Sequence, residues 1–177
     1  MKIIAICGSS RKGNTEFVLT RMLMKADKLD AETDSVILRD KRIEYCEGCL
    51  ECEKTGKCKI KDNMQDIYDR LEKSDIIIFG GPSYFGNFTG LEKNFIDRLR
   101  PYCTNGKLKE KKTVIVTVGE DDQAQTMNVV KNFEIVAEKL GLIVVGDVDF
   151  IAKGPRDVEE NPQNMEKING FIVNIIS

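Results

Sequence analysis

Histidine and tryptophan are both absent from this chain of 177 residues. Without an imidazole, Ser-His-Asp and Cys-His catalysis in their usual forms, zinc sites with histidine ligands and Rieske-type clusters are excluded. Any acid–base or metal chemistry must therefore use Cys, Asp, Glu, Lys or Tyr side chains, or a bound cofactor.

The chain also lacks a large net charge and a long apolar run. The chain has 27 Lys and Arg against 29 Asp and Glu, a net charge of −2, which argues against the strongly basic face of a nucleic-acid-binding protein. No apolar run approaches the roughly 20 residues of a membrane span, and the apolar stretch at residues 3–7 is too short for the core of a signal peptide. We expect a cytoplasmic protein with no nucleic-acid or membrane partner.

Short apolar runs, rich in β-branched residues, alternate with segments of helical periodicity. We expect strands at residues 3–7, 35–38, 75–79, 113–118 and 142–145, and helices at residues 15–29, 64–71, 91–99, 127–140 and 163–176. In the first helix we expect Phe17, Val18, Met22 and Met24 to form the buried stripe. Apolar runs without alternation are typical of strands buried on both faces of a parallel sheet. The order predicts an α/β domain with a doubly wound, five-stranded parallel sheet and helices on both faces.

The loop after the first strand has the composition of an anion site. Residues 8–13 fit the G-x-x-x-x-G frame of a nucleotide-binding P-loop, but Asn14 stands where the lysine belongs, and Ser10 breaks the dinucleotide fingerprint G-x-G-x-x-G. The backbone N–H groups of the following helix, the side chains of Ser9, Asn14 and Thr15, and the charge of Arg11 can together hold a phosphate. The alternative is that the Ser, Asn and Thr side chains only cap the helix.

The loop after the third strand, residues 80–90, places three aromatic residues among glycines. In open α/β sheets, ligands bind at the carboxyl ends of the strands, at the topological switch point. Tyr84 or Phe85 could flank a planar ligand there, and the glycines would let the backbone approach it. The alternative is that the aromatic side chains cover the edge of the sheet.

Four cysteines lie close together in the pattern C-x2-C-x2-C-x5-C: Cys46, Cys49, Cys52 and Cys58. Ferredoxins of the bacterial type share the C-x2-C-x2-C core, whose spacing wraps thiolates around an iron–sulfur cluster. A zinc knot and a cluster of reduced thiols remain as alternatives. Cys7 and Cys103 stand outside the pattern, and we expect Cys7 to be a small buried residue of the core.

Several of these segments together resemble a known family. The motifs are Gly-Ser-Ser-Arg-x-Gly-Asn-Thr at residues 8–15, Gly-Gly-Pro-Ser-Tyr-Phe-Gly at 80–86 and Gly-x-x-Lys-x-Phe-x-Asp-Arg at 90–98. They resemble the flavodoxin-like, FMN-binding oxidoreductases of the NAD(P)H-dependent FMN reductase group. The cysteine pattern, between the second strand and the second helix, resembles that of the iron–sulfur flavoproteins of anaerobic archaea and bacteria.

The resemblance implies a single flavodoxin-like, FMN-binding domain over residues 1–177, with a compact cysteine loop at 43–62. It implies FMN contacts from three loops and a [4Fe–4S] cluster, and it assigns no catalytic protein side chain. The implied FMN residues are Ser9, Ser10, Arg11, Gly13, Asn14 and Thr15 around the phosphate, Pro82, Ser83, Tyr84, Phe85, Gly86 and Asn87 along the ring, and Thr117, Gly119 and Glu120 in the third loop. The implied cluster ligands are Cys46, Cys49, Cys52 and Cys58.

The third loop departs from the often glycine-rich loop of the family, since it continues as Glu120-Asp121-Asp122-Gln123. Three adjacent carboxylates should disfavour a dianionic ligand nearby, whereas a neutral ring tolerates them better.

The expected function is electron transfer between the cluster and FMN, and onward to a small or protein acceptor. The resemblance implies a redox partner such as ferredoxin or NAD(P)H, and a homodimer or homotetramer in which flavin and cluster approach each other across subunits. One alternative is a cluster-free NAD(P)H-dependent FMN or quinone reductase with zinc-bound or redox-active cysteines. Another is a flavin-binding or zinc-stabilised interaction module without enzymatic activity.

Overall fold

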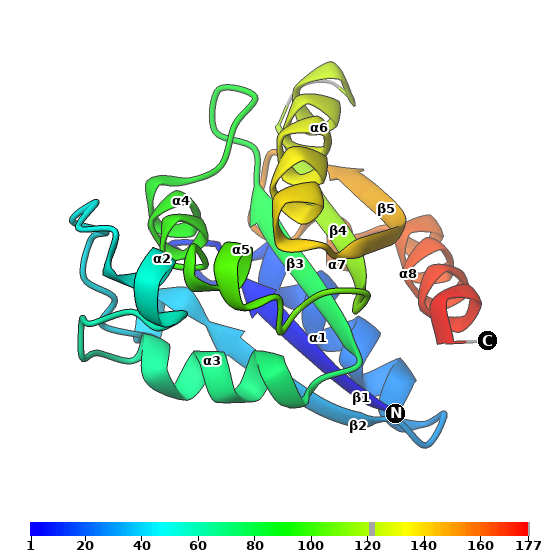
Figure 1. The fold of residues 1–177 in the computed structure, drawn as a ribbon. Coiled ribbons are helices and arrows are strands. Elements are labelled where there is room, and N and C mark those ends of the chain that lie inside the picture. Colours follow the sequence, from blue (N-terminus) through cyan, green and yellow to red (C-terminus); the bar gives the residue numbers. More distant parts are fainter. Residues whose placement is uncertain (121–122, 177) are drawn as a thin grey trace.

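The computed structural model describes residues 1–120 and 123–176. Its five parallel strands form one sheet in the order β2-β1-β3-β4-β5 (Figure 1). The strands are β1 (Lys2–Cys7), β2 (Glu32–Ile37), β3 (Ile76–Pro82), β4 (Lys112–Gly119) and β5 (Ile143–Ile151). This strand order is that of the flavodoxin-like doubly wound fold. The predicted fold class is therefore confirmed.

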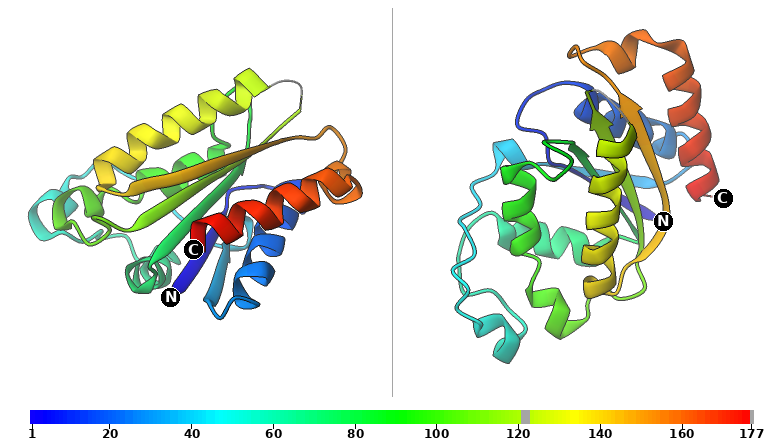
Figure 2. Two further views of the ribbon diagram at one scale, coloured as in Figure 1. Left: turned by 90° about the vertical axis from the view of Figure 1, so that its right-hand side faces the viewer. Right: turned by 90° about the horizontal axis from the view of Figure 1, so that it is seen from above.

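Helices cover both faces of the sheet, as Figure 2 shows. One face packs against α1 (Asn14–Asp27), the short α7 (Asp157–Glu160) and α8 (Pro162–Ile176). The other packs against α3 (Met64–Lys73), α4 (Gly90–Asp97), α5 (Pro101–Asn105) and α6 (Gln123–Leu140). The 3₁₀ turn η1 (Leu38–Asp40) follows β2, and the short helix α2 (Glu51–Thr55) lies in the cysteine loop. None of the described helices is long and apolar enough to cross a membrane.

The central strands are buried on both sides, which explains their continuous apolar sequences. In β1, Ile4 and Ile6 belong to one core and Ile3, Ala5 and Cys7 to the other. Burial raises the pKa of the Cys7 thiol to about 11, as expected for a thiol in an apolar environment. The prediction that Cys7 is a small core residue is confirmed.

The two edge strands differ from their predicted extents. β5 continues to Ile151, and its residues alternate between exposed and half-buried positions over most of its length. The predicted strand ended at residue 145 because Gly146, Asp147 and Asp149 interrupt the apolar run. An edge strand keeps such residues on its solvent side while its backbone still pairs with β4. β2 likewise begins earlier than predicted, at Glu32.

The buried stripe of α1 is only partly the predicted one. Val18 and Met22 are fully buried, together with Leu19 and Ala26. The expectation for Met24 is wrong, since 49% of its surface is exposed. With 3.6 residues per turn, a face that contains positions 18, 22 and 26 turns position 24 away from the sheet.

Candidate functional site

An open pocket with about 680 Å³ of empty space lies at the carboxyl edge of the sheet. Ends of β1, β3, β4 and β5 meet there, so the pocket brings together all three loops that the sequence singled out. Most of the predicted cofactor residues line it: Ser9, Arg11, Gly13, Asn14, Thr15, Pro82, Ser83, Tyr84, Gly119 and Glu120. The juxtaposition follows from parallel strands ending at one edge.

The first loop presents an uncapped helix end to this pocket. No described side chain caps the N-terminus of α1, so the helix-cap interpretation of the Ser, Asn and Thr residues is wrong. Ser9 is buried, and its hydroxyl donates to the backbone oxygen of Arg11 at 2.8 Å. The uncapped backbone N–H groups and the helix dipole favour a negative charge at this position.

The Asn14 side chain is committed to another segment of the chain. Its Nδ2 donates to the backbone oxygen of Gly154 at 2.7 Å, and its Oδ1 accepts from the N–H of Val158 at 3.1 Å. These bonds tie the start of α1 to the β5–α7 connection. Asn14 therefore positions the loop, and what it offers a ligand is its backbone N–H.

The second loop forms a tight hairpin that projects from the sheet edge beside α6 (Figure 1). Tyr84 and Asn87 exchange backbone hydrogen bonds of 2.9 and 3.0 Å around Phe85 and Gly86, which have φ values of 53° and 70°. Positive φ at both central residues is the geometry of a type I′ turn. Tyr84 lines the pocket, whereas the Phe85 ring at the tip is fully exposed.

Three of the remaining predicted residues lie beside the pocket rather than in its wall. Gly86 and Asn87 belong to the hairpin tip, and Thr117 is buried in β4, where its hydroxyl has no described partner. Ser10 contacts the second loop, because its hydroxyl lies 3.4 Å from that of Tyr84. Asp121 and Asp122, which the sequence analysis expected in the third loop, lie outside the described residues.

The sequence analysis missed Lys153, which lines the pocket from the loop after β5. Its position could not be anticipated, because the predicted strand ended six residues before the end of β5. An apolar run reports where a strand is buried, not where an edge strand stops.

Glu92 was also missed. Its side chain is 4% exposed, its Oε2 has no described partner, and burial raises the pKa of the carboxyl group to about 8. It lies against two glycines at the carboxyl ends of β1 and β3: a Cβ built on Gly81 would stand 2.0 Å from Oε2, and one on Gly8 would stand 2.8 Å from Cδ. A signal existed, since Glu92 shares the buried face of α4 with Phe95 and Ile96, at i+3 and i+4.

The four cysteines of the pattern line one cavity at the opposite end of α4, together with Arg98 and Arg100. Cys52 is buried in α2, Cys58 is half-buried, and Cys46 and Cys49 are exposed. Gly48 and Leu50, with φ values of 64° and 60°, give the chain the tight bends between them. The structure thus brings together all four predicted metal ligands.

The donor set of this cavity suits an iron–sulfur cluster. Its four cysteines can supply four thiolates, and cysteine thiolates are the ligands that hold iron–sulfur clusters in proteins. With no histidine in the chain, the soft donors at this site are thiolates alone.

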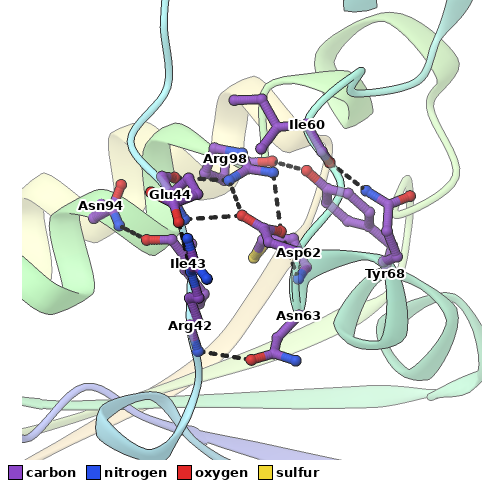
Figure 3. A network of polar contacts seen from close by, with 11 residues as sticks. Arg42, Ile43, Glu44, Ile60, Asp62, Asn63, Tyr68, Asn94 and Arg98 are labelled. Carbon is purple, nitrogen blue, oxygen red and sulfur yellow. Dashed lines mark hydrogen bonds and ion pairs between the residues drawn. The ribbon is translucent and has the colours of Figure 1, made fainter.

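A buried ion pair closes the base of the cysteine loop, as Figure 3 shows. Arg98 and Asp62 lie 2.6 Å apart with 0% and 2% of their side chains exposed. Arg98 Nη1 also donates to the backbone oxygen of Glu44 at 2.7 Å, while the Asp62 carboxylate accepts from the N–H groups of Glu44 and Met64 at 2.8 and 2.9 Å. Both ends of the loop are therefore held by one pair.

The same contacts fix the charge of Asp62. Burial opposes ionisation, but the hydrogen bonds from Arg98 and the two backbone N–H groups outweigh it and hold the pKa of the Asp62 carboxyl below its usual range. Two further bonds support the base: Arg42 N–H donates to Asn63 Oδ1 at 2.6 Å, and Asn94 Nδ2 donates to the backbone oxygen of Ile43 at 2.8 Å.

Comparison with known proteins agrees with this geometry. The sequence model of the NADPH-dependent FMN reductase family matches residues 1–157. An iron–sulfur flavoprotein of Methanocaldococcus jannaschii is 33% identical, over 94% of this chain and 91% of its own, and one of Methanosarcina thermophila is 33% identical over 83% and 78%. A solved flavone reductase superposes with a TM-score of 0.78 at 20% identity, over 99% of this chain and 62% of its own, which supports the fold alone. The chain therefore belongs to the NADPH-dependent FMN reductase family of oxidoreductases, as a member of its iron–sulfur flavoproteins.

Proposed function

We propose that this protein transfers electrons between a [4Fe–4S] cluster held by Cys46, Cys49, Cys52 and Cys58 and an FMN held in the pocket at the sheet edge. The observation that carries the proposal is that all four cysteines of the pattern line one cavity. When bound, the cluster would exchange single electrons and FMN would exchange one or two, so the protein itself supplies binding, orientation and electrostatics.

The uncapped N-terminus of α1 is the proposed phosphate site. Arg11 adds a positive charge and Thr15 a hydroxyl group, while Ser9 and Asn14 hold the loop through their bonds to the backbone oxygens of Arg11 and Gly154. A terminal phosphomonoester matches backbone N–H groups at a helix end. Lys153, from the loop after β5, also lines the pocket.

The proposed ring site lies between the second and third loops. Tyr84 offers an aromatic face, and the backbone at Gly119 and Glu120 offers hydrogen-bonding groups. Ser83 N–H donates to the backbone oxygen of Val118 at 2.8 Å, which holds these two loops together. The flavin ring would lie against backbone that this hydrogen bond already holds in place.

The two proposed cofactor sites lie on different parts of one chain, which supports the expected homo-oligomer. In Figure 1 the cysteine loop lies outside α4 and α5, apart from the ends of β4 and β5. Both regions carry exposed apolar side chains: Tyr45 and Leu50 on the cysteine loop and Phe85 on the hairpin. We propose that these surfaces meet in a homodimer or homotetramer, which a molar mass from light scattering would test.

Lysines around the cysteine loop support an acidic redox partner such as ferredoxin. The four exposed lysines are Lys54, Lys57, Lys59 and Lys61, of which Lys59 pairs with Glu47 at 2.8 Å. The loop also carries Glu44, Glu47, Glu51 and Glu53, so the lysines would attract a negatively charged partner through their local charge rather than through a net basic surface. The rate of reduction by such a partner should therefore fall as the salt concentration rises.

The direct test of the proposal is analysis of protein reconstituted anaerobically with FMN, iron and sulfide. We expect about four irons, about four acid-labile sulfides and one FMN per chain. A flavin gives resolved visible bands and a cluster adds a broad shoulder. One zinc with no sulfide would overturn the cluster.

A second candidate is direct reduction of the flavin by NAD(P)H, which the family match favours. Anaerobic mixing with NADPH distinguishes the two functions. If flavin bleaching is as fast in a cluster-free Cys52→Ala variant as in the wild type, NADPH delivers its electrons to the flavin directly. If NADPH leaves the flavin oxidised while a ferredoxin-type donor reduces it, the electron-transfer function stands.

A further inference from the structure

Arg98 has one buried donor that the fold leaves unused. Its two terminal nitrogens point to Asp62 and to the backbone oxygen of Glu44, but its Nε–H has no partner among the described residues. The side chain exposes none of its surface to water. A buried unpaired donor is costly and calls for a specific explanation.

The geometry of the ion pair explains why this donor remains available. Asp62 meets the guanidinium end-on, through Nη1 at 2.6 Å and Nη2 at 3.3 Å. Arg70 shows the other arrangement: its Nε donates to Asp34 at 2.8 Å, so the carboxylate covers the Nε side of the group. The end-on pair holds the Arg98 guanidinium rigidly while leaving its Nε–H for another acceptor.

The wall of the cysteine cavity includes Arg98. An acceptor in this cavity would be a sulfur, since the cavity is lined by the four cysteines and would hold the sulfide of a cluster. A sulfide or thiolate sulfur that is bonded to iron carries negative charge, and it therefore accepts hydrogen bonds readily.

We propose that Arg98 Nε–H donates a hydrogen bond to a sulfur of the cluster and thereby raises its reduction potential. The inference rests on the proposed cluster. Reduction adds negative charge to the cluster, and a fixed donor and a buried cation both stabilise that charge. The same residue would thus clamp the loop through Asp62 and adjust the redox property of the group that the loop holds.

The alternative is that Arg98 only clamps the loop. Arg98→Lys separates the two roles, because the ammonium can still pair with Asp62 but lacks the planar fork that directs a separate Nε–H. Arg100→Lys is the matched control. Arg100 lines the same cavity and carries the same charge, but it is exposed and its Nη2 is bonded to Glu53.

The experiment compares wild type, Arg98→Lys and Arg100→Lys after anaerobic reconstitution to equal iron and sulfide content. We expect the midpoint potential of the cluster, followed by EPR, to shift to a more negative value in Arg98→Lys and to stay near the wild-type value in Arg100→Lys. Resonance Raman Fe–S bands should lose part of their shift in D₂O only in Arg98→Lys. Equal potentials and equal D₂O shifts in all three proteins would overturn the inference.

A measurement on the wild type covers the case in which Arg98→Lys does not load a cluster. Pulsed EPR of the reduced cluster in protein labelled with ¹⁵N-arginine should show a ¹⁵N coupling, retained in Arg100→Lys. If the protein has full iron and sulfide but shows no such coupling, the role of Arg98 is overturned while the proposed cluster stands. A wild type that takes up no iron and sulfide overturns the proposed cluster and this inference with it.

Discussion

Two polar residues, one just before α1 and one at its first position, illustrate how side chains that both can donate hydrogen bonds take different roles. Arg11 is exposed at the pocket, while Asn14 is buried and bonded to Gly154 and Val158. The sequence alone predicts that both side chains bind a ligand, because both can donate hydrogen bonds beside a helix N-terminus. Only the contacts show that the Asn14 amide holds the loop.

Arg11→Ala should weaken FMN binding by about 1 kcal/mol, roughly five- to tenfold in Kd, since solvent screens an exposed charge. The remaining binding should depend less on salt, because one charge pair is gone. Fluorescence titration of FMN at two ionic strengths measures both effects. Riboflavin, which lacks the phosphate, should bind both proteins alike.

Arg21→Ala, on α1 but outside the pocket, is the control for the Arg11 variant. It should leave the Kd for FMN unchanged. Equal affinity of the Arg11→Ala variant and the wild type would contradict the phosphate assignment.

Asn14→Ala should lower the free energy of unfolding of the apoprotein by about 1–3 kcal/mol, because the buried N–H of Val158 and the half-buried carbonyl of Gly154 lose their partner. Urea unfolding measures the change. Ser10→Ala, which removes one exposed hydroxyl at 3.4 Å from Tyr84, should change it little. An Asn14→Ala protein with wild-type stability but no FMN binding would show that the amide serves the ligand directly.

At the scale of elements, α4 links the loop after β1 to the cysteine loop. Its N-cap, Thr89, accepts from the N–H of Glu92 at 3.0 Å and donates to the backbone oxygen of Gly8 at 2.9 Å. Its C-terminal end leads to Arg98, which holds the base of the cysteine loop. A displacement of α4 would therefore affect both sites.

The buried Glu92 makes the docking of α4 dependent on pH. Its pKa is raised from 4.5 to about 8, so between these values the folded protein keeps a proton that the unfolded chain releases. Stability therefore falls as the pH rises through this interval. Glu92→Gln keeps the shape without the proton, and it should reduce the loss of unfolding free energy between pH 5 and pH 8 by about 2–4 kcal/mol.

Urea unfolding of the apoprotein at the two pH values tests this, with the exposed Glu134→Gln as control. An identical pH dependence in Glu92→Gln and wild type would mean that the carboxylate is ionised in the folded protein.

Element boundaries were predictable where strands are central and poorly predictable at the edges. β1 and the core of β3 and β4 lie where their apolar runs indicated, because both faces of each strand are buried. β2 and β5 have one exposed side, so polar residues enter them and the sequence signal breaks off early. The loop after β5 was misplaced for this reason.

At the scale of the whole molecule, the two sites are built from separate segments and share no lining residue. Cys52→Ala should therefore lose most of the iron and acid-labile sulfide while keeping one FMN per chain. Each missing thiolate leaves an iron without its protein ligand. Metal, sulfide and flavin analyses of the reconstituted protein measure all three contents.

Cys103→Ala is the matched control, because Cys103 is exposed and lies outside the four-cysteine pattern. It should retain full iron and sulfide. Iron loss in Cys103→Ala with full iron in Cys52→Ala would contradict the ligand assignment. Loss of FMN in Cys52→Ala would show that the two sites depend on each other.

The sequence by itself determined the fold class and located the loop after β1 and the cysteine pattern, because each is encoded by residues close together along the chain. Tertiary structure alone decided which side chains line the pocket and which hold the fold together. Asn14 reaches residues 154 and 158, Glu92 lies against Gly8 and Gly81, and Arg98 closes a loop that begins more than fifty residues earlier. Such partners are far apart in sequence, so no local periodicity or spacing reports them; they are fixed only when the strands align and bring their loops to the same edge.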